Sequence, residues 1–331
     1  MDYDFLNNYA IDPDDPTYSD AWRRVLGRLG DYTAFILRSL NMRPTDIVLL
    51  DQTPVHVRVR VSTPTMHLVL RIAPEGDLSG AVYFGRVMAT HQFPAARIIH
   101  ADMTCSLVPF TYIVEGHVCG TNVDLIDSSH LVRAAARQTG RLLRRMHRIS
   151  AAGWGRPNRN GRWTFPDWRA VLASLHAMLA SASLEALLFD ETERATIATL
   201  LDHPALVVTE PRLMHGAPSP RVTLCTVGEH VQLEALTNPG WAVAGDGLLD
   251  LAWGLNPVFR PEWRMGLLEG YNALATLSAA ETERLRLLRL LTCYWHTCQS
   301  YARVEPFEAI RAETLALFAE MNADPNDSLS N

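Results

Sequence analysis

Apolar and polar residues alternate strictly along one segment in the first third of the chain. Between residues 55 and 61 valine occupies every odd position, and His56, Arg58 and Arg60 occupy the even ones. A period of two predicts a β-strand with one buried face. The run STPT that follows is a turn signal, and HLVLRIA at 67–73 has the composition of another strand. We therefore expect an antiparallel sheet here.

The segments on either side of this sheet carry helical patterns. In residues 19–40 the apolar positions recur every three or four residues, with a break expected near Gly30. Residues 78–93 predict a second helix, and two apolar runs after it, 96–102 and 110–118, predict further strands. The first third of the chain therefore predicts a small lobe built on a sheet.

From about residue 128 onward the pattern is mainly helical. Apolar residues keep a helical spacing through five segments, at 130–149, 165–180, 191–202, 281–303 and 307–322. Two short β-type runs, 221–227 and 230–236, interrupt these helices and predict a hairpin. The sequence thus predicts an α+β protein with a β-rich lobe followed by a larger helical lobe.

Four regions follow from these patterns. Residues 1–18, rich in Asp, Pro and Tyr, predict an extended N-terminal arm, and residues 324–331 predict a disordered tail. Between them we expect an N-lobe at 19–115 and a helical C-lobe at 116–323.

Composition narrows the class of protein. The 331 residues are 48% hydrophobic and 20% charged, with a net charge of −6, which is typical of a globular protein and argues against a nucleic-acid-binding body. No apolar run approaches membrane-spanning length, and the acidic N-terminus lacks the pattern of a signal peptide, so we expect no membrane partner and a cytoplasmic location.

Residue usage adds two points. All 30 basic residues are Arg, which indicates codon bias in the GC-rich genome of a bacterium and leaves no Lys for catalysis. The five cysteines are scattered without a CxxC pair, so we expect free thiols and no zinc site.

Six segments carry candidate chemistry or landmarks of a fold. In chain order they are HLVLRIAPE, FPAARII, YIVEGHVCGTNVDL, GRLLRRMHRISAAGWGR, LMHGAPSPRV and NPGWAVAGDGLLDLAWGL. Together they resemble the aminoglycoside phosphotransferase and choline kinase-like family, which is related to the protein kinases, over roughly residues 40–275. The resemblance implies a protein kinase-like two-lobe fold.

The resemblance also implies roles for single residues. It makes Arg71 the phosphate-contacting cation on a strand of the first lobe. Glu115, His117 and Trp241 become candidates to line a nucleotide cleft, Trp241 by filling space that a nucleotide would take. The remaining matched residues are expected to support the catalytic loop, and they are His215, Gly216, Gly245, Asp246 and Asp250.

The residues that would carry out phosphotransfer are missing from the matched motifs. Ala217 stands where the family has the carboxylate beside the nucleophile, Val222 where it has an Asn, and Asn238 where it has the main metal carboxylate. No Glu lies near position 83 to pair with the basic residue, and LLDQTPVHV contains no Gly for a phosphate-covering turn.

This selective loss favours a catalytically inactive member, a pseudokinase. It would act as a binding or regulatory module through a retained cleft between its lobes, with a protein, peptide or small-molecule ligand and with no cofactor. The alternative is a divergent but active phosphotransferase that uses Mg²⁺ with ATP or GTP, with Asn238, Glu234 or Asp246 holding the metal. A nucleotidyl transferase on the same scaffold is a third possibility.

Overall fold

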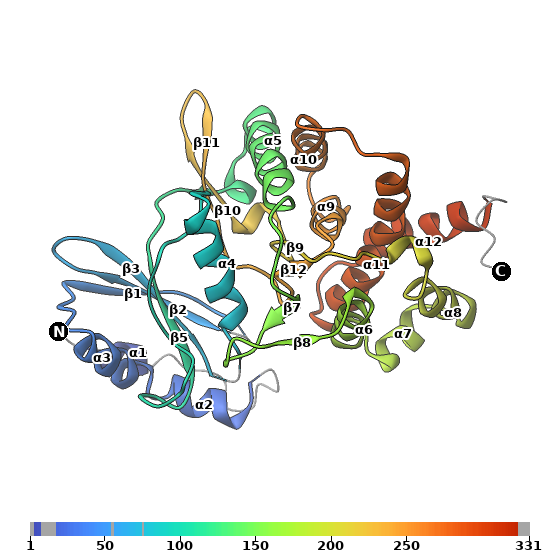
Figure 1. The fold of residues 1–331 in the computed structure, drawn as a ribbon. Coiled ribbons are helices and arrows are strands. Elements are labelled where there is room, and N and C mark those ends of the chain that lie inside the picture. Colours follow the sequence, from blue (N-terminus) through green and yellow to red (C-terminus); the bar gives the residue numbers. More distant parts are fainter. Residues whose placement is uncertain (1–2, 8–17, 54–55, 75, 324–331) are drawn as a thin grey trace. The chain divides into compact units, whose positions relative to one another are not determined.

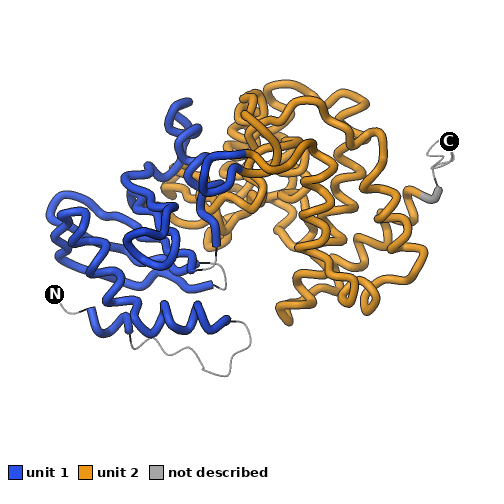
Figure 2. The backbone as a smooth tube through the Cα atoms, turned by 60° about the horizontal axis from the view of Figure 1, so that its bottom comes forward, with its two compact units in different colours: residues 1–118, 157–162 blue, residues 119–156, 163–331 orange. Residues whose placement is uncertain are grey.

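The computed structural model describes residues 3–7, 18–53, 56–74 and 76–323. The chain forms two compact units (Figure 2): unit 1 comprises residues 1–118 and 157–162, and unit 2 comprises residues 119–156 and 163–331. Unit 1 is built on an antiparallel sheet and unit 2 is mainly helical (Figure 1), which confirms the predicted α+β class. The sequence placed this boundary between residues 115 and 116.

The sheet of unit 1 has five antiparallel strands in the order β1-β2-β3-β5-β4. Their bounds are β1 (Asp46–Gln52), β2 (Val57–Ser62), β3 (His67–Ala73), β4 (Ile98–Asp102) and β5 (Thr111–Gly116). Strand β2 forms where the alternation predicted a strand, β3 forms at the predicted 67–73, and β4 and β5 lie within the apolar runs at 96–102 and 110–118. Val55 lies outside the described residues.

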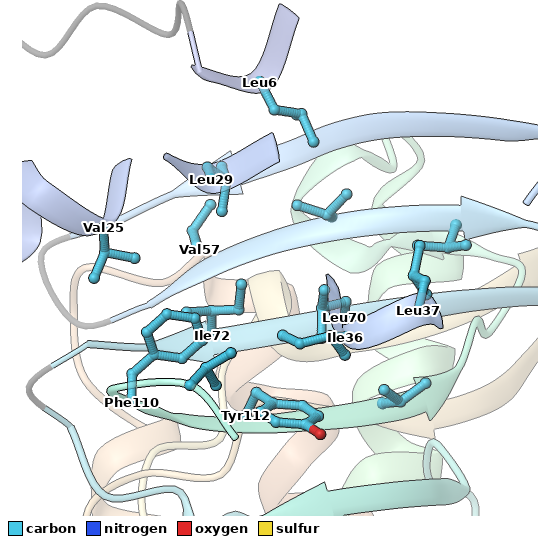
Figure 3. Packing of buried hydrophobic residues seen from close by; sticks show 14 of the residues in the cluster. Leu6, Val25, Leu29, Ile36, Leu37, Val57, Leu70, Ile72, Phe110 and Tyr112 are labelled. Carbon is cyan, nitrogen blue, oxygen red and sulfur yellow. The ribbon is translucent and has the colours of Figure 1, made fainter. Parts of the chain in front are cut away.

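One face of this sheet forms the core of unit 1 (Figure 3). Val57, Val59 and Val61 are fully buried there, because alternate side chains of a strand point to the same face. Helices α1 (Asp4–Asn7), α2 (Asp20–Leu26) and α3 (Leu29–Ser39) supply the other side of this core. On the opposite face a smaller apolar cluster joins α4 (Ser79–Thr90) to Ile113. The arginines of β2 lie on that opposite face.

The leading helices differ from the predicted pattern in two places. The break between α2 and α3 falls at Gly27 and Arg28, and not near Gly30. Gly30 lies inside the first turn of α3, where its N–H donates to the side chain of Asn7 at 2.7 Å. Part of the segment expected to be an extended arm is therefore the short helix α1, whose Leu6 is fully buried.

Unit 2 contains eight α-helices among its described residues. They are α5 (Ser129–Met146), α6 (Trp168–Leu179), α7 (Ala182–Leu188), α8 (Glu191–Leu200), α9 (Leu248–Gly254), α10 (Pro261–Asn272), α11 (Ala279–Ala302) and α12 (Glu308–Ala323). No single described helix is both long and apolar enough to cross a membrane, although α6 and α7 meet the length and composition criteria as a bent pair.

Short strands connect these helices in two small sheets. One sheet has the order β11-β10-β6, with β6 (Thr121–Asn122), β10 (Thr223–Val227) and β11 (Val231–Leu236). The other has the order β8-β7-β12-β9, with β7 (Trp154–Pro157), β8 (Trp163–Phe165), β9 (Arg212–Leu213) and β12 (Ala244–Gly245). The predicted hairpin is β10–β11.

Helices α5 and α10 lie side by side (Figure 1), and their backbones touch. A Cβ atom placed on Gly270 would lie 2.0 Å from the carbonyl oxygen of Arg137, and one on Gly140 would lie 2.2 Å from that of Leu267. These contacts are with backbone atoms, so no side-chain rotation can relieve them. The two helices can therefore pack this closely only because glycine occupies both positions.

We predict that Gly270→Ala destabilises the protein by about 1–3 kcal/mol, the usual cost of overpacking a tight core. Helix propensity alone would predict the opposite, a gain of roughly 0.5–1 kcal/mol. Urea unfolding of the variant and of the control Gly228→Ala, whose new Cβ would meet only His230 O at 3.8 Å, measures the effect. Unchanged or increased stability of Gly270→Ala would refute the packing argument.

Candidate functional site

The loop between β9 and β10 holds the HGAPSPRV motif, and a buried carboxylate on α9 fixes its backbone. Asp250 is fully buried and accepts hydrogen bonds from the backbone N–H of His215 and of Gly216, both at 2.6 Å. His147, at the end of α5, donates its Nε2–H to the same carboxylate at 3.1 Å. Three donors from two distant segments thus converge on one side chain.

A chain of hydrogen bonds connects His147 to helices α10 and α11. Its Nδ1 accepts from the hydroxyl of Tyr271 at 2.9 Å, and Arg144 donates to that hydroxyl at 3.4 Å while pairing with Glu281 at 3.0 Å. Burial raises the pKa of Tyr271 to about 12, so its hydroxyl keeps the proton that it donates. The loop is therefore tied to α5, α10 and α11 through Asp250.

The imidazole of His215 also stabilises the loop through hydrogen bonds. It is completely buried, its Nε2–H donates to the carbonyl of Thr237 at 2.8 Å, and its Nδ1 lies 3.4 Å from the N–H of Ala217. Burial lowers the pKa of His215 below its ordinary value of 6.5, against the opposing charge of Asp250. The neutral ring satisfies both contacts, whereas a protonated Nδ1 would face the N–H of Ala217.

The segment from 237 to 245 lies directly against this loop. The N–H of Gly240 donates to His215 O at 2.7 Å, and the N–H of Met214 donates to Val243 O at 3.0 Å. Gly216 has a φ of 86°, and a Cβ there would lie 2.1 Å from Ala242 O. Only glycine can adopt this conformation at this distance. The Gly of the motif is thus required by the backbone.

The three positions that the family resemblance assigns to phosphotransfer offer few atoms that could bind a metal ion. Ala217 and Val222 have hydrocarbon side chains, and Asn238 presents an amide at a φ of 52°. The Oδ1 atom of Asn238 is buried and accepts no hydrogen bond from the described residues. Within the described part of the chain, no group of three or more His, Cys, Asp or Glu side chains could hold a metal ion. This donor set does not fit Mg²⁺, which requires carboxylate oxygens.

The two carboxylates considered as substitute ligands have other contacts. Glu234 accepts a hydrogen bond from the hydroxyl of Thr226 at 2.8 Å, across the β10–β11 hairpin. Asp246 pairs with Arg284 at 2.8 Å and accepts from the N–H of Leu248 at 3.0 Å, next to the start of α9. Burial raises the pKa of Asp246, against the opposing charge of Arg284.

In unit 1 the guanidinium of Arg71 is paired within the sheet. Its Nη2 donates to Glu115 on β5 at 2.9 Å, and the exposed fractions of the two side chains are 5% and 13%. Helix α4 contains no acidic residue, in agreement with the missing Glu. His117, after β5, lies with its ring 6.3 Å from that of His67. Burial lowers the pKa of His117.

Two predicted site residues of unit 2 pack against aromatic neighbours. Trp241 meets the ring of Phe165 edge-on at 5.4 Å, and the guanidinium of Arg156 lies 5.0 Å from the Trp241 ring. A Cβ on Gly245 would lie 2.0 Å from the indole of Trp168. Both residues therefore have local packing partners in unit 2.

Comparison with known proteins identifies the fold and the family. The family model described as "Phosphotransferase enzyme family" matches residues 55–288, more than half of the chain. The chain belongs to this phosphotransferase family. No curated protein matches the sequence.

Several solved structures share the fold at low sequence identity. A thermostable mutant of aminoglycoside phosphotransferase APH(4)-Ia, solved with ADP and hygromycin B, has a TM-score of 0.62 at 17% identity, over 86% of this chain and 97% of that one. The GDP and kanamycin complex of APH(2")-IIia has a TM-score of 0.56 at 12% identity, over 89% of this chain and 99% of that one. Spectinomycin phosphotransferase APH(9)-Ia has a TM-score of 0.51 at 14% identity, over 90% and 96%.

The polar cluster around Arg71 was not predicted from the sequence. Asp51 on β1 pairs with Arg58 on β2, and the Nε2 atom of His56 lies 4.0 Å from the carboxylate of Asp51. Burial, with the charge of Arg71, lowers the pKa of His56 to about 4. The even positions of the alternating segment carried a signal for this cluster, because those side chains share the face of the sheet that Arg71 occupies.

We predict that Asp250→Asn destabilises the protein by about 3 kcal/mol, since buried donors lose the charged acceptor that they share. Urea unfolding measures this loss. The control is Asp167→Asn at the N-cap of α6, where an exposed carboxylate accepts one backbone N–H and Asn caps equally well. Equal, small effects of the two substitutions would contradict the role of Asp250 as an anchor.

We predict that His215 makes stability fall below neutral pH. Its pKa is lower in the folded than in the unfolded state, so the unfolded chain binds the proton first as pH drops below about 6.5. The stabilisation is complete above that pH and is lost as the pH falls toward the folded-state pKa. As the pH falls below about 6.5, His215→Gln should lose less stability than the wild type, by up to about 1.4 kcal/mol per pH unit. Parallel stability curves would contradict this assignment.

Proposed function

We propose that this chain is a member of the phosphotransferase family that does not transfer phosphate and instead acts as a binding or regulatory module. The observation that carries the proposal is the contrast within one loop. The residues that fix its backbone, His215, Gly216 and Asp250, are in hydrogen-bonding contact, whereas Ala217 and Val222 present no oxygen. Its ligand would be a protein, a peptide or a small molecule.

Phosphoryl transfer depends on positioned charges more than on covalent chemistry. It requires a metal ion to neutralise the developing charge and a carboxylate to orient the attacking hydroxyl. Mg²⁺ is held by carboxylate and phosphate oxygens, and an amide such as that of Asn238 contributes no negative charge. The methyl group of Ala217, the isopropyl group of Val222 and the amide of Asn238 cannot supply those charges.

The arrangement of the loop supports a retained structural role. Its backbone is ordered by Asp250, His147 and Thr237, which are all groups of the protein. These hydrogen bonds are made within the protein and do not involve a metal ion or a nucleotide. A binding module requires only such a rigid framework, since preorganisation reduces the entropy lost on binding.

One observation favours the alternative, a divergent active transferase. The Oδ1 atom of Asn238 is buried and accepts no hydrogen bond from the described residues, and such an oxygen can coordinate a cation. Under this alternative, Mg²⁺ with ATP or GTP would bind at Asn238, and a carboxylate such as Asp246 would have to leave Arg284. The two functions differ in whether a metal-dependent reaction occurs at all.

We predict that the purified protein transfers no labelled γ-phosphate from ATP or GTP to a panel of aminoglycosides, in the presence of Mg²⁺. An active aminoglycoside phosphotransferase assayed in parallel serves as the positive control. The variants Arg71→Gln and Asn238→Ala should give the same background signal as the wild type. Mg²⁺-dependent transfer by the wild type that either substitution abolishes would overturn the proposal and establish the alternative.

A further inference from the structure

The polar face of the sheet in unit 1 carries arginines and carboxylates in a regular order. Arg58 on β2 stands directly opposite Arg71 on β3, and Asp51 on β1 stands opposite Arg58 on its other side. Glu115 on β5 lies two residues from the position opposite Arg71. The order across the sheet is therefore carboxylate, guanidinium, guanidinium, carboxylate.

Two like charges directly opposite on neighbouring strands repel each other. The structure resolves this repulsion by giving each guanidinium its own carboxylate. Arg58 donates to Asp51 from Nε at 2.8 Å, and Arg71 donates to Glu115 at 2.9 Å. Burial, with the charge of Arg71, lowers the pKa of His56 to about 4, so this ring adds no positive charge near neutral pH. The four charged groups sum to zero.

The two pairs differ in their exposure to solvent. The side chain of Arg71 is 5% exposed and that of Glu115 is 13% exposed, against 24% for Arg58 and 33% for Asp51. The Nε atom of Arg71 is buried and donates to no acceptor among the described residues. Removing one partner of a buried ion pair leaves an uncompensated charge, which attracts a replacement anion strongly. Arg71 therefore depends on Glu115 more than Arg58 depends on Asp51.

A guanidinium binds carboxylates and phosphates through the same fork of N–H donors. Glu115 already accepts from the Nη2 donor of this fork, so an external anion would compete with it for that donor. We propose that Glu115 is a specificity-determining residue that occupies Arg71 and keeps phosphate-bearing ligands off this face of the sheet. The inference deepens the proposed function and rests on it, because a working nucleotide site would need Arg71 for phosphate.

The test compares anion binding by the wild type and by Glu115→Gln, which keeps the shape of the side chain and removes its charge. Inorganic pyrophosphate and ATP, each with EDTA, are titrated by calorimetry and by thermal unfolding. The wild type should show no binding and no shift of Tm. Glu115→Gln should bind pyrophosphate at least about tenfold more tightly than the wild type, the effect of one new charge-assisted hydrogen bond.

Two further variants show whether Arg71 is the group that is released. The double variant Arg71→Gln/Glu115→Gln should lose the gained binding, and Asp51→Asn, which frees the more exposed Arg58, should gain less. If Glu115→Gln gains affinity for ATP but not for pyrophosphate, the new contacts are to the nucleoside. This result would overturn the assignment to Arg71. Equal gains in Asp51→Asn and Glu115→Gln would also overturn it.

The wild-type titration keeps the inference falsifiable even if Glu115→Gln does not fold. Pyrophosphate binding by the wild type that Arg71→Gln removes would show that Glu115 does not exclude anions. This failure is distinct from that of the proposed function, which requires Mg²⁺-dependent phosphate transfer. Both the proposed function and this inference are supported if the wild type neither binds pyrophosphate nor transfers phosphate and Glu115→Gln gains pyrophosphate binding.

Discussion

The carboxylate of Asp250 is the interaction on which the candidate site depends. It is fully buried, and it accepts hydrogen bonds from two successive backbone N–H groups of the loop and from His147. A buried carboxylate is stable only when such donors surround it, and the loop is ordered only while the carboxylate is there. Through His147 and Tyr271 the same interaction reaches helices α5 and α10, whose close packing at Gly270 positions them. The conformation of the loop is therefore coupled to the packing of these two helices.

Structural support and chemistry are carried by different residues in this protein. The supporting set acts on the loop backbone through His215, Gly216 and Asp250, which are joined by hydrogen bonds within the protein. The chemical set would act on substrates through positions 217, 222 and 238, and only an amide remains there. In unit 1 the charge of Arg71 is likewise compensated within the protein, by Glu115 on the neighbouring strand. Under the proposed function, the chain keeps the fold of its family while the groups that would bind phosphate and metal are replaced.

The sequence predicted the fold well because its signals are local. Alternation from 55 to 61 reports which face of a strand is buried, and that information requires no knowledge of the rest of the chain. The helix break was misplaced by about three residues, because Gly30 resembles a breaker locally. In the structure its N–H is capped by Asn7, which lies 23 residues earlier. Tertiary contacts of this kind leave no periodic pattern.

The site was predictable only in part, for the same reason. The motif spacing assigned roles to Ala217, Val222 and Asn238, which stay predictions, and the missing Glu of α4 was read directly from the sequence. The partner that Arg71 has instead could not be read, because Glu115 is 44 residues away and reaches Arg71 only through the β3–β5 register. Likewise, the anchoring of two loop amides by Asp250 depends on where α9 packs.

The most direct test of the central claim is nucleotide binding by the unmodified protein. Thermal unfolding would be recorded with ATP and with GTP, each with Mg²⁺ and again with EDTA. A ligand at a hundred times its Kd adds roughly 2.7 kcal/mol to stability, which such a measurement detects easily. The account predicts no shift of Tm under any of these conditions. A shift that requires Mg²⁺ would show that a metal site exists despite the residues at 217, 222 and 238, and it would contradict the account.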